Sequence, residues 1–103
     1  MEEIYIDYLL HTPINIDLSD FDFTGVEKIV LTAKKYMNNK KYTVLVKEFT
    51  EAKIYTVTVT PEESKRFDGD VRYDFIAFMT NGEVYKVSDV GVMVLREGVG
   101  TSE

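Results

Sequence analysis

The sequence predicts an antiparallel β-sandwich of about seven strands with one short helical turn. Two runs carry this prediction, Ile54–Thr60 and Val71–Thr80, in which apolar residues recur at every second position. A period of two with many β-branched residues is typical of half-buried strands. Further alternating runs follow about every ten residues with turns between them, which is the spacing of a sandwich. We expect one core that contains Tyr55, Val57, Val59, Tyr73, Phe75, Ile29 and Leu31.

Length and composition favour a single domain held together by packing. The chain has 103 residues, and 45% of them are hydrophobic, which is enough for one core. It contains no cysteine, which excludes disulfides and thiolate sites and fits assembly in the cytoplasm. The net charge of −6 repels phosphate backbones, and no apolar run is long enough for a membrane helix. We expect a domain over residues 1–96, a flexible tail over 97–103, and neither nucleic-acid binding nor membrane insertion.

The N-terminal strand is expected over Glu3–Leu10 and again over Ile14–Leu18. Pro13 interrupts it because proline has no N–H to donate to a ladder. We expect one edge strand split in two, which shortens the exposed edge of the sheet. The segment Asp20–Gly25 then forms a turn, whose final glycine can adopt a positive φ.

The next element is expected to be a strand over Val26–Tyr36, with Ile29, Leu31 and Ala33 facing inward. A helix over Glu27–Met37 is the alternative, since alanine and lysine favour helix. The β-branched pair at 29–30 and the flanking strands favour the strand.

A hairpin returns the chain through Asn38-Asn39 into a strand over Tyr42–Thr50. Asparagine tolerates left-handed backbone angles, which suits a tight turn. Lysines crowd this hairpin, and lysines on an outer strand deter edge-to-edge aggregation. They are Lys34, Lys35, Lys40, Lys41 and Lys47.

The sharpest local signal lies between the two organising runs. Thr60 can cap a helical turn, Pro61 suits its first position, and Glu63 can reach back to complete a capping box. We predict a short helix or 3₁₀ turn over Pro61–Arg66, followed by Phe67 at the end of the core.

Two turns and two strands are expected after Phe67. Asp68-Gly69 turns the chain into the second organising run, and Asn81-Gly82 predicts a two-residue type I′ hairpin turn. Glu83–Val87 then pairs back. The last strand contains Val90, Val92 and Val94 and ends near Leu95.

No residue pattern points to a reaction, a cofactor or a metal. His11 is the only histidine, and no nucleophile pattern accompanies it. Asp17, Asp20 and Asp22 are close in sequence, but a calcium loop needs about 6–8 oxygen ligands, so turn-forming aspartates are the simpler interpretation. The carboxylates of residues 62–70 lie in one loop, whereas glycosidases oppose two carboxylates across a cleft. We therefore expect a protein that is not an enzyme and has no cofactor.

The strand Val71–Thr80 is apolar on both faces. If Phe75 faces the core, Ile76 and Phe78 face outward, where a strand exposed to water should be polar. Either a loop or the N-terminal strand covers them, or they form a partner surface. Burying two such side chains stabilises an assembly by roughly 3–6 kcal/mol. We hypothesise self-association or docking through this face, with Val30 as a neighbour.

Three segments carry a family resemblance: FTGVEKIVLTAKK, YTVTVTPEES and VRYDFIAFMTNGEVYKV. Together they resemble the immunoglobulin-like domain of phage baseplate upper proteins and related prophage tail proteins, over roughly Leu18–Leu95. The resemblance implies an immunoglobulin-like β-sandwich that serves as a non-enzymatic structural and assembly module of a tail, baseplate or fibre. It also implies that the partners are other phage particle proteins or a second copy, in a virion assembled in the bacterial cytoplasm.

A second class of function stays open from the residues alone. The chain has seven tyrosines and six phenylalanines. Exposed aromatic rings on a β-sandwich can form a platform for sugars. The alternative is therefore a small carbohydrate-binding β-sandwich that uses exposed aromatics.

Overall fold

The computed structural model describes residues 3–88 and 90–96, so the expected tail over 97–103 lies outside the described residues. The described elements, in chain order, are β1 Glu3–Asp7, β2 Thr12–Asp17, β3 Val26–Met37, β4 Lys40–Phe49, β5 Ile54–Val59, α1 Pro61–Ser64, η1 Lys65–Phe67, β6 Asp70–Met79, β7 Val84–Lys86 and β8 Gly91–Arg96. The predicted all-β architecture with one short helical turn is confirmed.

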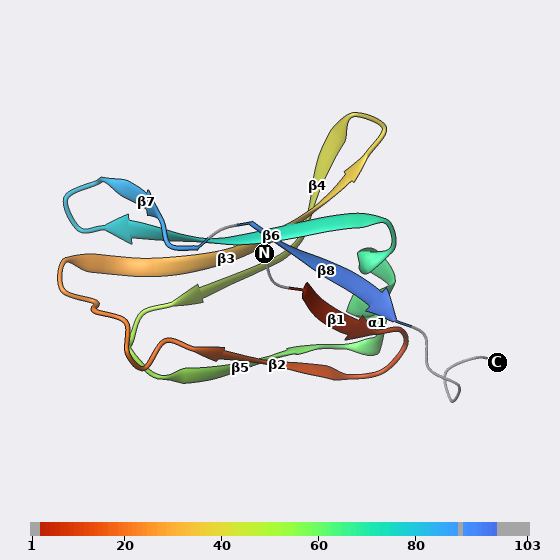
Figure 1. Ribbon diagram of the computed structural model, residues 1–103, viewed down its shortest axis with the longest axis horizontal. Coiled ribbons are helices and arrows are strands. Elements are labelled where there is room, and N and C mark those ends of the chain that lie inside the picture. The colour runs from red at the N-terminus through yellow and green to blue at the C-terminus, as the bar shows by residue number, and fades with distance from the viewer. Residues whose placement is uncertain (1–2, 89, 97–103) are drawn as a thin grey trace.

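The strands form two sheets that pack face to face (Figure 1). The larger sheet has the order β1-β8-β6-β3-β4, and β7 also pairs with β6. The smaller sheet pairs β2 with β5. Every described ladder is antiparallel except that of β1 and β8, which run parallel. Alternation did not predict the parallel pair, because its period is the same for both strand directions.

The prediction of one N-terminal edge strand split in two is wrong, because its halves lie in different sheets. β1 pairs with β8 and β2 pairs with β5. At the break Leu9 has a φ of 61°, and its N–H donates to Ser64 Oγ at 2.8 Å. The Asp7 N–H donates to Thr12 Oγ1, also at 2.8 Å. These bonds anchor a crossover that moves the chain from one layer to the other.

β3 and β4 form the expected hairpin, which excludes the helical alternative over 27–37. Asn38 and Asn39 have φ values of 54° and 62°, so both turn residues are left-handed, as in a type I′ turn. The register shifts after the Ala33–Leu45 pair, so that Val44 has no residue opposite it. This β-bulge buries two consecutive residues, Val44 and Leu45. β4 is an edge strand, as its lysines predicted.

The predicted capping box is confirmed. The Glu63 N–H donates to Thr60 Oγ1 at 3.1 Å, and the Thr60 N–H donates to Glu63 Oε1 at 3.0 Å. That second bond lowers the pKa of Glu63, because it stabilises the charged carboxylate. The turn continues as η1 to Phe67, which is fully buried as predicted.

The prediction of a type I′ turn at Asn81-Gly82 is wrong. Gly82 has a φ of 94°, but Asn81 does not have a positive φ. The Gly82 N–H donates to the Met79 carbonyl at 3.0 Å, and the Met79 N–H donates to the Glu83 carbonyl at 2.8 Å. The loop is therefore longer by one residue and ends in a left-handed glycine. Asn81 Oδ1 instead accepts a bond from the Glu83 N–H at 2.9 Å, which fixes the loop.

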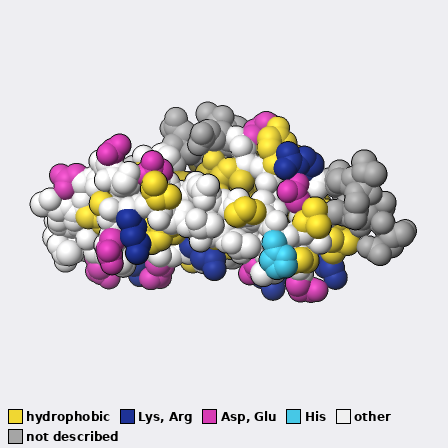
Figure 2. Space-filling view, turned by 90° about the horizontal axis from the view of Figure 1, so that it is seen from below, with side chains coloured by type: hydrophobic (Ala, Val, Ile, Leu, Met, Phe, Trp, Pro, Cys, Tyr) yellow, Lys and Arg dark blue, Asp and Glu magenta, His cyan; other side chains and the backbone are white. Residues whose placement is uncertain are grey.

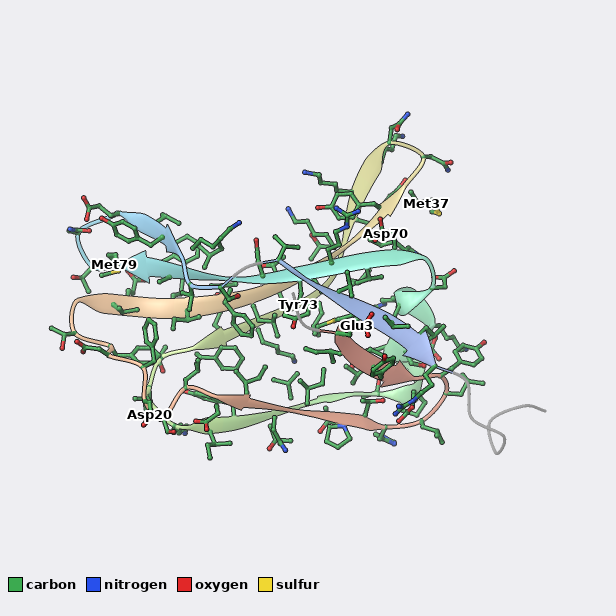
Figure 3. The ribbon with its side chains drawn as sticks, viewed as in Figure 1. Glu3, Asp20, Met37, Asp70, Tyr73 and Met79 are labelled. Carbon is green, nitrogen blue, oxygen red and sulfur yellow. The ribbon has the colours of Figure 1, made fainter. Side chains whose placement is uncertain are left out.

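The core lies between the two sheets, where Figure 3 shows Tyr73 at the centre. Of the predicted core residues, five are buried and two, Tyr55 and Phe75, are partly buried and pack against the cluster. Gly91 on β8 lets the Tyr73 ring approach the backbone, because a Cβ at this position would lie 2.5 Å from two ring carbons. The core prediction is therefore confirmed, and it leaves the opposite face of β6 turned outward.

Candidate partner-binding face

The outer face of the larger sheet is the face turned away from β2 and β5. Val30, Ile76 and Phe78 lie on this face, because the residues that alternate with them, such as Leu31 and Ala77, are buried in the core. Val30 stands directly opposite Ile76 on the neighbouring strand. All three side chains are partly buried. The structure thus brings the three predicted surface residues together.

The sheet topology shows which elements lie against this face. β1 lies within the larger sheet, beside β8, so it does not cover this face. β7 runs alongside β6, with Val84 opposite Phe78 and Lys86 opposite Ile76. The Lys28 ammonium lies 5.5 Å from the centre of the Phe78 ring. Neighbours within the sheet therefore account for part of the burial.

Two exposed valines extend the apolar surface beyond the predicted residues. Val46 is 48% exposed and stands opposite Thr32, and Val84 is 54% exposed and stands opposite Phe78. We call the set of five side chains the apolar strip. It consists of Val30, Val46, Ile76, Phe78 and Val84. Val46 could not be predicted from the sequence, because the bulge at 44–45 changes the alternation just before it.

Charged side chains border the apolar strip. Lys28 Nζ lies 3.4 Å from Glu48 Oε2, and Glu48 stands opposite Val30. Lys86 stands opposite Ile76 on β7 and is exposed. An apolar centre with a charged border is the usual anatomy of a protein–protein interface.

A groove hollows the same face toward the β3–β4 hairpin, with a volume of about 290 Å³. Its lining includes Ile76 from the apolar strip and three cations, Lys34, Lys41 and Arg72. The Arg72 guanidinium and the Lys41 ammonium lie 5.1 and 5.5 Å from the centre of the Tyr36 ring. Both distances are within the range of cation–π attraction, so the tyrosine holds the two cations at the groove.

The other residues considered as sites from the sequence lie outside this face. His11 is exposed in the crossover between β1 and β2. The Asp17 carboxylate accepts bonds from the Ser19 hydroxyl and N–H, and the Asp22 carboxylate accepts one from the Thr24 N–H. These bonds lower the pKa of both aspartates and confirm their turn-forming role. In residues 3–88 and 90–96, no group of three His, Cys, Asp or Glu side chains is placed to hold a metal ion.

The acidic side chains that follow β5 form a helix cap and ion pairs. Glu63 completes the capping box. Asp68 Oδ1 accepts a bond from Lys35 Nζ at 2.8 Å, which lowers the pKa of the aspartate. Asp70 Oδ2 lies 3.1 Å from the Arg72 guanidinium. Asp68 and Asp70 both line a hollow beside β8, and each carboxylate is paired with a cation of this chain.

The exposed tyrosines do not share one platform. Tyr36 stands opposite Lys41, so Tyr42, the next residue on β4, points to the other face of the hairpin. Tyr85 stands opposite the core residue Ala77 and lies on the inner face of the larger sheet. Tyr5 is on β1, at the far edge of that sheet.

Comparison with known proteins supports the fold. No protein-family model and no curated protein matches the chain. A solved structure of murine CRIg is similar in fold, with a TM-score of 0.56 and 5% sequence identity over 93% of this chain and 93% of that chain. The predicted immunoglobulin-like β-sandwich is thereby confirmed. Among the described residues, no helix has the length and apolar character to cross a membrane.

Proposed function

We propose that this protein is a non-enzymatic structural and assembly module of a phage or prophage particle that acts through protein–protein contacts. The apolar strip on the outer face of the larger sheet is the observation that carries the proposal. The resemblance of the three sequence segments to baseplate and tail domains supports the particle as its setting. A tail, a baseplate or an associated fibre is the assembly in which the module serves.

The energetic reason lies in the exposed side chains of the strip. Each aliphatic or aromatic side chain that passes from water into an interface contributes up to about 1.5–3 kcal/mol. Val46 and Val84 are about half exposed, and the three central residues are partly buried, so the strip still has area to bury against a partner. The charged border then sets the orientation of that partner.

The scatter of the exposed tyrosines favours protein docking over sugar binding. A sugar platform needs aromatic faces that lie side by side, whereas Tyr36 lies on the outer face of the larger sheet and Tyr42 and Tyr85 lie on the other face. Tyr42 and Tyr85 are in turn separated by β3 and β6. Carbohydrate binding is the alternative function, and a glycan array tests it.

Cross-linking mass spectrometry of particles purified from the strain that encodes the chain tests the proposal. We expect the chain in the particles, with cross-links to another particle protein from Lys28 and Lys86, which border the apolar strip. Lys53, before β5, and Lys65, in η1, serve as internal controls on other surfaces. Absence from the particles, or cross-links confined to the two control lysines, would contradict the proposal. Saturable binding on a glycan array would favour the carbohydrate alternative.

A further inference from the structure

We infer that the groove beside the apolar strip receives an acidic segment of the partner protein that also carries an apolar side chain. The inference rests on the proposed function and specifies the chemistry of the partner at the same face. It is carried by an arrangement of charges that the fold does not need.

Two cations stand directly opposite each other in the groove. Lys34 on β3 is in register with Arg72 on β6. Like charges at opposite positions of a sheet destabilise it, and opposite charges stabilise it. A chain with 18 acidic and 12 basic residues has enough carboxylates to neutralise such a pair, yet both opposite positions carry a cation and, among the described residues, only Arg72 has an acidic partner. A carboxylate from another protein would neutralise Lys34.

The cations of the groove are only partly neutralised within the described chain. Arg72 pairs with Asp70, with nitrogen–oxygen distances of 3.1 and 3.3 Å. Neither Lys34 nor Lys41 is within ion-pair distance of an acid among the described residues. Their ammonium groups are therefore available to carboxylates of a partner, as charge-assisted hydrogen bonds require.

The rest of the groove sets the spacing of the segment. Ile76 and Val90 line it and offer an apolar surface beside the cations. Asp74 also lines it, opposite Thr32, and would repel a carboxylate placed near it. The carboxylates of the segment therefore belong at Lys34 and Lys41, and its apolar side chain belongs over Ile76, which continues into the apolar strip.

A labelled peptide tests the inference with the whole protein. The probe is a fluorescein-labelled decapeptide of alternating glutamate and isoleucine, and a lysine–isoleucine decapeptide is its matched control. We expect fluorescence anisotropy to show binding of the glutamate peptide alone, weakening as ionic strength rises because salt screens the contacts. Equal binding of both peptides, or of neither, would overturn the inference.

Charge-reversal variants locate the binding site. Lys34→Glu combined with Lys41→Glu should weaken binding of the glutamate peptide by about tenfold or more, because two attractive contacts become repulsive. Lys53→Glu combined with Lys65→Glu makes the same change of net charge outside the groove and should leave the affinity unchanged. If the two double variants bind alike, the groove is not the site.

Failure of the inference can be told apart from failure of the proposed function. Cross-links from Lys28 or Lys86 to a particle protein, without binding of the glutamate peptide, would overturn the acidic segment and leave the proposed function standing. Peptide binding in the groove, with the chain absent from particles, would support the groove chemistry and contradict the particle role.

Discussion

The two outer faces of the sandwich differ in composition, although both are built from alternating strands. The outer face of the smaller sheet carries polar side chains such as Asn15, Thr56 and Thr58, and Thr56 Oγ1 donates to Asn15 Oδ1 at 3.1 Å. Figure 2 shows that side of the molecule, with extensive uncoloured surface between scattered charged and apolar side chains. The outer face of the larger sheet carries the apolar strip instead.

The difference shows what the period of two does and does not determine. Alternation alone accounts for the smaller sheet, because one phase of each strand packs in the core and the other faces water. In β6 the core phase is mostly apolar, and the outer phase passes from charged residues to the apolar pair Ile76 and Phe78, so this pair needs an explanation outside the core. We propose that a partner protein covers Ile76 and Phe78.

Neighbouring residues on β3 provide the largest expected contrast. Leu31→Ala should lower the free energy of unfolding by about 2–5 kcal/mol, because it leaves a cavity in the core. Val30→Thr, on the outer face, should lower it by less than about 1 kcal/mol. Urea unfolding of both variants measures the contrast. Equal losses would place Val30 in the core and remove it from the partner surface.

The capping box provides a change that concerns the fold alone. Thr60→Ala removes the acceptor for the Glu63 N–H and should cost about 0.5–2 kcal/mol of stability. Binding of the glutamate peptide should not change, since α1 lies outside the groove. A parallel loss of affinity in the folded variant would show that the two regions are coupled.

The pH dependence of stability tests the other bond of the capping box, in which the Thr60 N–H donates to the Glu63 carboxylate. The pKa of Glu63 is lowered in the folded state, so its contribution to stability is present above its unfolded pKa and is lost as the pH falls through its folded pKa. Below about pH 4.3 the wild-type protein should therefore lose the advantage that it has over Glu63→Gln at neutral pH. Thermal unfolding of both proteins from pH 7 to acid measures this. A difference that persists at the lowest pH would mean that the carboxylate charge is not the cause.

Lys34→Glu should cause the smallest change in stability, and it should change stability and peptide binding in opposite directions. It converts the like-charge pair with Arg72 into an opposite-charge pair and should raise the free energy of unfolding by about 0.2–1 kcal/mol. The same variant should bind the glutamate peptide more weakly. A gain in stability with a loss of binding would show that the cation is kept for its partner, whereas a loss of both would make it a structural residue.

Local signals in the sequence predicted most of the fold. The capping box depends on residues three apart, and the asparagine turn depends on two neighbours, so both could be read directly. The crossover between β1 and β2 could not be predicted from local signals, because β1 pairs with β8, the strand farthest from it in sequence. The longer loop at 79–83 was missed because Asn-Gly occurs in more than one hairpin type.

The candidate partner-binding face was also predicted only in part, because only some of its residues can be recognised within a single strand. Ile76 and Phe78 were visible as apolar residues in the outward phase of one strand. The groove was not visible, because it depends on Lys34 and Arg72 being opposite each other on strands distant in sequence. Register of this kind is set by the pairing of whole strands.

Thermal unfolding of the double variant Ile76→Thr/Phe78→Lys tests most directly whether the apolar strip serves a partner and not the fold. We predict a circular dichroism spectrum like that of the wild type and a melting temperature within about 5 °C of it, because the core face of β6 is untouched. Thr58→Lys on the smaller sheet is the matched surface control. A double variant that is unfolded, or that melts more than about 15 °C below the control, would show that Ile76 and Phe78 belong to the core and would contradict the partner surface.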